Sequence, residues 1–130
     1  MNMYHDPEIW ERSRQFCSDL YQLTATDSYY QTFYYTPILR QIAVLVPTHI
    51  MLAYQAPKPD VFIRHLDFTL GAAYELRTLL MFNVLLDFEE KSPNRPLIHK
   101  INILIASINL LRERVQTGRT PRSKRTILWT

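Results

Sequence analysis

The chain has 130 residues, 47% of them hydrophobic and 21% charged, with a formal net charge of +3. That length suits one domain with a hydrophobic core of its own. Two glycines in the whole chain argue against β-sandwiches and barrels, which use glycine in their turns, and against glycine-rich phosphate loops. The single cysteine, Cys17, excludes an internal disulfide and a metal site built from several thiolates.

The first helix is predicted over residues 7–26. Asp6 suits the N-cap and Pro7 the first turn. Ile9, Phe16 and Leu23 recur every seven residues and predict one apolar stripe. The tyrosine-rich segment 27–35 that follows is expected to close one end of a bundle or to join an interface, and base stacking is the alternative.

The second helix is predicted over residues 36–54, with Thr36 as its cap and Pro37 at the first helical position. Pro47 lies inside this helix. Because proline has no N–H to donate to the carbonyl of Ala43, we expect a kink there.

The third helix is predicted over residues 60–90, with fraying at its acidic end. The fourth follows residues 92–96 and ends at Gly118. Its apolar residues follow a heptad seam, formed by Leu97, Ile101, Leu104, Ile108, Leu111 and Val115. Short connections make successive helices antiparallel. The sequence therefore predicts an all-α, up-and-down four-helix bundle over residues 1–116 and a basic C-terminal tail over residues 117–130.

Positive charge is concentrated at one end of the sequence. Residues 1–113 have a net charge of −2, whereas residues 114–130 carry five Lys or Arg and no acid. A basic arm on a near-neutral body is a common arrangement for contacting nucleic acid, and a solubilising end is the alternative. The candidate phosphate contacts are Arg112, Arg114, Arg119, Arg122, Lys124 and Arg125, with Arg12, Arg14, Arg40, Arg64 and Arg77 on the body.

The second and third helices are apolar on more sides than one bundle can cover. Surplus apolar surface of this kind marks an interface, so we expect a homo-oligomer. The residues predicted to form its interface are Leu39, Val46, Ile50, Gly71 and Glu75.

No arrangement of residues indicates catalysis. The four histidines, His5, His49, His65 and His99, include no i,i+4 pair, and no glutamate has a histidine three residues later. Cys17 falls on the apolar stripe of the first helix, where a small buried side chain is expected. We therefore expect no metal, no cofactor and no enzymatic activity. The first residues show no signal peptide, and no apolar run approaches the roughly 18 residues of a membrane span, so a cytoplasmic protein without membrane contact is expected.

A family of small four-helix bundles is similar to this chain in the first-helix residues Ile9-Trp10, Leu20-Tyr21 and Thr24 and in the segments 39–50 and 62–80. The resemblance covers roughly residues 9–115. This family includes proteins encoded in intervening sequences of 23S rRNA genes and the accessory variability determinant (Avd) proteins of diversity-generating retroelements. Its helix 2 pattern, Arg-Arg-Ala-Ala-Val-Ser-Ile-Pro-Ser-Asn-Ile-Ala-Glu-Gly, is matched at Ala43, Val44, Pro47 and Ile50, and its helix 3 pattern, Gly-Ser-Leu-x-Glu-Leu-x-Thr, at Gly71, Glu75 and Leu76. The segment 49–53 is more apolar than the Asn-Ile-Ala-Glu-Gly ending, which favours an Avd-type member.

The resemblance implies a homopentameric ring and binding of RNA or DNA. It also implies a reverse transcriptase as partner during mutagenic cDNA synthesis from template RNA. Two alternatives stay open, namely a protein of the 23S rRNA-intervening type and a protein-interaction scaffold that binds no nucleic acid.

Overall fold

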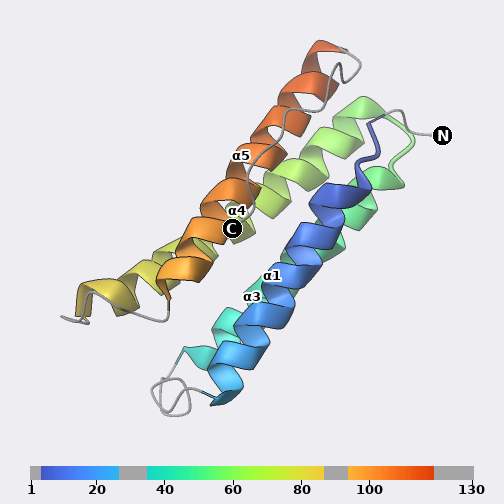
Figure 1. Ribbon diagram of the computed structural model, residues 1–130. Helices are drawn as coiled ribbons and strands as arrows, with labels where there is room; N and C mark the ends of the chain where they lie inside the picture. Colours follow the sequence, from blue (N-terminus) through green and yellow to red (C-terminus); the bar gives the residue numbers. More distant parts are fainter. Residues whose placement is uncertain (1–3, 27–34, 87–93, 119–130) are drawn as a thin grey trace.

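The computed structural model describes residues 4–26, 35–86 and 94–118, which form four helices and no strand. They are α1 (Pro7–Thr26), α3 (Thr36–Tyr54), α4 (Pro59–Leu86) and α5 (Arg95–Thr117). Each helix packs against the next one in the chain, and α5 packs against α1. Figure 1 shows that successive helices run in opposite directions. The all-helical bundle predicted from the sequence is therefore confirmed. Three segments that entered the predictions lie outside the described residues, namely the tyrosine-rich segment 27–34, the acidic segment 87–90 and the basic segment 119–125.

The helix ends follow local signals at three of the predicted positions. Asp6 accepts a hydrogen bond from the backbone N–H of Glu8 at 3.0 Å through its carboxylate, as an N-cap does. Gly118 adopts a left-handed conformation, φ 70°, directly after α5. Pro37 lies in the first turn of α3. The prediction of Thr36 as the cap of α3 is wrong, because Thr36 is already helical and buried and Tyr35 precedes the helix without a side-chain cap bond.

One apolar core runs the length of the bundle. The predicted stripes supply it, since Ile9 and Phe16 of α1 and the whole seam of α5 are buried. Its largest fully buried side chains are Phe16, Phe62, Leu20, Leu39, Ile50, Leu66, Leu76, Leu80, Ile101, Leu104 and Ile108.

Polar side chains in this core have hydrogen-bond partners. The hydroxyls of Thr24, Thr69 and Ser107 each donate to the carbonyl four residues earlier, at 2.9 Å. Asn94, which precedes α5, donates from Nδ2 to the carbonyl of Leu80 and so joins the start of α5 to α4. No buried side-chain nitrogen or oxygen among the described residues lacks a partner, as a well-formed interior requires.

Pro47 and Cys17 are linked across two helices. Pro47 lies inside α3 and has no N–H to give to the carbonyl of Ala43. The thiol of Cys17, which is half-buried on α1, donates to that carbonyl with Sγ 3.0 Å from the oxygen. A hydrogen bond that the proline removes from α3 is thus replaced from α1, which explains why a polarisable thiol lies on an otherwise apolar stripe.

By length and composition α3, with 19 residues, is the one helix among those described that is apolar enough to cross a membrane. This differs from the expectation that no run approaches that length. The core helices of soluble proteins meet the same criteria, and 39% of the apolar 18-residue stretch of α3 is buried inside the bundle. The observation alone therefore does not identify a membrane span.

Candidate functional site

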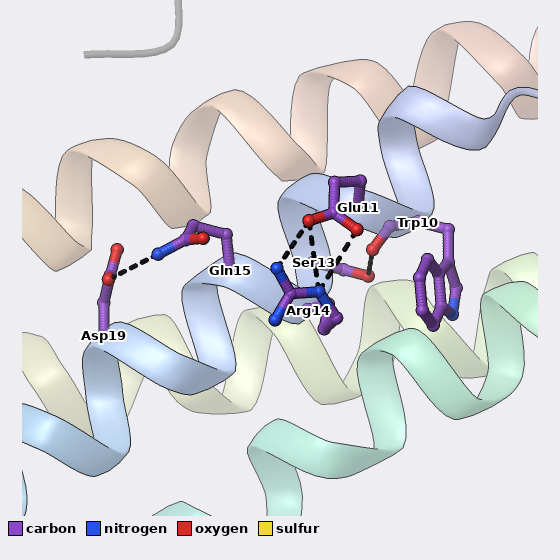
Figure 2. A network of polar contacts seen from close by, with 6 residues as sticks. All are labelled: Trp10, Glu11, Ser13, Arg14, Gln15 and Asp19. Carbon is purple, nitrogen blue, oxygen red and sulfur yellow. Dashed lines mark hydrogen bonds and ion pairs between the residues drawn. The ribbon is translucent and has the colours of Figure 1, made fainter.

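The arginines of α1 that were predicted to contact phosphate form ion pairs within α1. Arg12 Nη2 lies 2.6 Å from Glu8 Oε1, and Arg14 pairs with Glu11 through two nitrogens (Figure 2). The Arg14 hydrogen bond and charge lower the pKa of the Glu11 carboxyl, and Glu11 raises the pKa of Arg14 in return. These i,i+4 and i,i+3 pairs neutralise α1 locally, so this surface offers little net positive charge to an anion.

Arg40 and Arg77 join neighbouring helices. The Nε of Arg40 donates to Thr24 Oγ1 at 2.7 Å, and its guanidinium lies 5.0 Å from the ring centre of Tyr21 on α1. Arg77 of α4 donates to Asn102 Oδ1 of α5 at 3.0 Å and lies 5.0 Å from the Tyr74 ring centre. Both side chains therefore have a structural role, with cation–π contacts that hold the guanidinium planes in place.

Of Arg64 and Arg112, only Arg112 forms an ion pair with a residue that the structure describes. Arg112 Nε lies 2.6 Å from Asp67 Oδ1, and Nη1 donates to Gln116 Oε1 at 3.1 Å. The hydrogen bond to Asp67 raises the pKa of Arg112. Arg64 is exposed and has no ion pair with any residue that the structure describes. Among the body candidates, Arg64 is thus the one best placed to receive an external phosphate.

Of the candidate cations from residue 114 onward, the structure describes Arg114 alone. Arg114 lies half-buried in the last turn of α5, where a cation is favoured by the helix dipole. The N–H of Gly118 bonds back to the carbonyl of Val115 and ends the helix there. The remaining candidates, Arg119, Arg122, Lys124 and Arg125, lie outside the described residues.

The predicted oligomer interface has to be corrected. Leu39, Val46 and Ile50 have 0% exposure and belong to the bundle's own core, so they cannot contact a second subunit. Gly71 and Glu75 are exposed, and a Cβ added to Gly71 would meet nothing within 4 Å. The prediction was wrong for α3 because that helix is apolar on most sides, and periodicity does not tell which side faces the core.

A different set of apolar residues lies on the outside of α3 and α4. On α3 the exposed side chains include Ile38, Leu45 and Leu52, spaced every seven residues, and on α4 they include Phe68 and Phe82, two heptads apart. We call these five residues the outer apolar strip.

Contacts of His49 show that the two halves of the outer apolar strip are adjacent. The His49 ring of α3 stacks on Phe68 of α4, with ring centres 4.5 Å apart and an interplanar angle of 22°. Leu45 and Leu52 lie one turn before and one turn after His49, on the same side of α3. Phe68 has 60% of its surface exposed despite this stacking. The strip therefore follows the line along which α3 and α4 meet.

The structure also brings together two histidines that the sequence did not pair. His49 Nδ1 lies 3.2 Å from His65 Nδ1, with the two rings on α3 and α4 respectively. Burial and the neighbouring His65 charge lower the pKa of His49. A search for i,i+4 spacing on one helix could not find this pair, because its members come from two antiparallel helices. No group of three or more His, Cys, Asp or Glu suited to a metal ion occurs among the described residues.

Two further titratable groups are structural. Burial raises the pKa of the Cys17 thiol to about 11, which is opposite to the activation that a nucleophilic cysteine needs. Tyr54 is buried and donates its hydroxyl to the carbonyl of Asp6, and burial raises its pKa. The expectation that Cys17 is a small buried side chain is confirmed in part, since the residue is half-buried rather than fully enclosed.

Comparison of the chain with protein-family models, with curated proteins and with solved structures gives no match. The resemblance to the 23S rRNA-intervening and Avd proteins therefore stays a prediction carried by the residues of α3 and α4.

Proposed function

We propose that this protein is a non-enzymatic, homo-oligomeric accessory protein that binds RNA or DNA through the cationic residues following α5. The observation that carries the proposal is the distribution of charge. Within the body, Arg12, Arg14 and Arg112 are paired with carboxylates. From residue 114 onward there are five Lys or Arg and no acid. Lys and Arg side chains that neutralise phosphates release condensed counterions, which favours binding, and a neighbouring carboxylate would compete with the phosphate for the same cation.

The resemblance to Avd proteins supplies the biological setting of the proposal. An Avd-type protein partners a retroelement reverse transcriptase during mutagenic copying of template RNA, and assembles as a pentamer. Several copies of one cationic segment on such a ring would strengthen weak contacts through a high effective concentration. A protein of the 23S rRNA-intervening type is the alternative within the same family.

Charge removal from the segment after α5 is expected to weaken binding to a short single-stranded RNA. The variant replaces Arg119, Arg122, Lys124 and Arg125 with glutamine. If each contacts one phosphate, the slope of log affinity against log salt should become shallower by roughly 3, since each contact contributes about 0.7 on single strands. Fluorescence anisotropy from low to high salt, with RNA and DNA of the same sequence, measures this slope.

The matched control uses arginines that are already paired. Arg12→Gln combined with Arg14→Gln removes two charges from α1, but these guanidiniums are occupied by Glu8 and Glu11. We expect the salt slope of this control to stay within error of the unaltered protein. Equal slopes for the four-residue variant and the unaltered protein would exclude the proposed role of the segment.

A protein-interaction scaffold is the second candidate, and the outer apolar strip favours it. Leucines and phenylalanines that are 36–60% exposed leave apolar area in water that association would bury, at about 25 cal/mol per Å². In this reading the strip mediates assembly, and no nucleic acid is bound.

Self-association through the outer apolar strip is expected to be lost on Leu45→Glu. The carboxylate would have to be desolvated in the interface, whereas in a separate bundle it stays in water because Leu45 is exposed. Light scattering over a range of concentrations should report an oligomer for the unaltered protein and a monomer for the variant. Gln22→Glu, which adds the same charge to an exposed position of α1, should keep the oligomer. A monomeric unaltered protein at every concentration would contradict self-association.

A further inference from the structure

We propose that His49 and His65 form a two-histidine site for a borderline divalent cation such as Zn²⁺, across the α3–α4 pair. The carrying observation is the approach of the two Nδ1 atoms to 3.2 Å. Two imidazole nitrogens bound to one tetrahedral zinc ion at 2.0–2.1 Å are about 3.3–3.4 Å apart. The backbone of the two helices therefore already holds the ligands at nearly the separation that a shared cation requires.

The facing nitrogens also limit how the pair exists without a cation. Both lone pairs cannot point at each other, so one Nδ1 must carry a proton that the other accepts. A divalent cation can take the place of that shared proton once the rings turn so that both lone pairs point to one place. Both rings are half-buried, which leaves them room to turn and leaves the outer coordination positions open to water.

The surroundings favour a preorganised site. Phe68 covers one face of the His49 ring, with ring centres 4.5 Å apart, and the Nδ1 edge of the ring lies toward His65. With two protein ligands, the remaining positions on a tetrahedral ion are filled by water or by an external donor.

Equilibrium dialysis of the untagged full chain against Zn²⁺ at neutral pH tests the site. We expect one bound zinc ion per chain, and a rise of the unfolding temperature by about 3 °C or more at saturating zinc. Mg²⁺, which prefers oxygen ligands, should give neither effect. His49→Gln and His65→Gln should each lower the bound zinc to below half of the unaltered value.

His99→Gln is the matched control, because it removes a histidine from an exposed position of α5 and should leave binding unchanged. Should a variant fail to give a helical circular dichroism spectrum, carbethoxylation of the unaltered chain serves instead, with zinc expected to protect His49 and His65 and not His99. No bound zinc, unchanged binding in both pair variants, or equal modification with and without zinc would overturn the proposal.

Discussion

Replacement of Phe62 by alanine is expected to lower the free energy of unfolding by about 3–5 kcal/mol, the cost typical of emptying a buried aromatic position. Phe62 is 1% exposed and lies beside two other rings of the core. Its ring centre is 6.3 Å from that of Tyr4 and 6.0 Å from that of Tyr54. Removing it leaves a cavity and also ends both aromatic contacts. Urea unfolding followed by circular dichroism, at one fixed protein concentration, measures the loss.

Phe68→Ala provides a control with the same chemical change on the same helix. Phe68 is 60% exposed, so its removal creates no cavity and loses mainly the stacking on His49. Such an aromatic contact is worth about 0.5–1.5 kcal/mol. The Phe62 variant should therefore lose about 1.5–4.5 kcal/mol more than the Phe68 variant. Equal losses would mean that the core is not where the structure places it.

Modification of Cys17 by a thiol reagent at pH 8 is expected to be about 100-fold slower in the native protein than in the urea-unfolded chain. Only the thiolate reacts. Burial raises the pKa of the Cys17 thiol from 9.0 to about 11. Each pH unit of that rise lowers the fraction of thiolate at pH 8 about tenfold. The hydrogen bond from Sγ to the carbonyl of Ala43 stabilises the protonated form as well.

Because Cys17 is the only cysteine, the release of one chromophore per chain follows this residue alone. Cys17→Ala gives the background rate of the reagent. Similar rates in the native and unfolded chains would show that the thiol is not held against α3. A faster native rate would indicate an activated cysteine and reopen the question of catalysis.

Whether an arginine of the body is available to an external phosphate depends on the partners that it has in the folded protein. Arg12 and Arg14 have acids one turn away, so their pairing could be anticipated from spacing. The pairing of Arg112 with Asp67 spans α4 and α5, and no local pattern predicts it. Charge counts along the sequence separate the body from the segment after residue 113. The structure adds that Arg12, Arg14 and Arg112 are paired within the body, whereas Arg64 has no ion pair among the described residues.

The four helices and most of their ends follow from local sequence signals. Asp6, Pro37 and Gly118 act through their own backbone geometry and through bonds to neighbours within a few residues. Heptad spacing defined the buried side of α5 correctly, because Leu97, Ile101, Leu104, Ile108, Leu111 and Val115 repeat along one side of the helix. Local signals suffice to predict a feature, such as a helix end, that depends only on residues within one or two turns.

Which surfaces remain exposed for function depends on how the helices pack against one another. Leu39 and Leu45 are equally apolar, yet Leu39 is fully buried and Leu45 is exposed, because the outcome depends on where α1 and α4 pack. The His49–His65 pair and the Cys17–Ala43 bond likewise join residues on different helices. Such contacts depend on the rotation and register of whole helices, which the packing of the complete core fixes and which no single segment encodes.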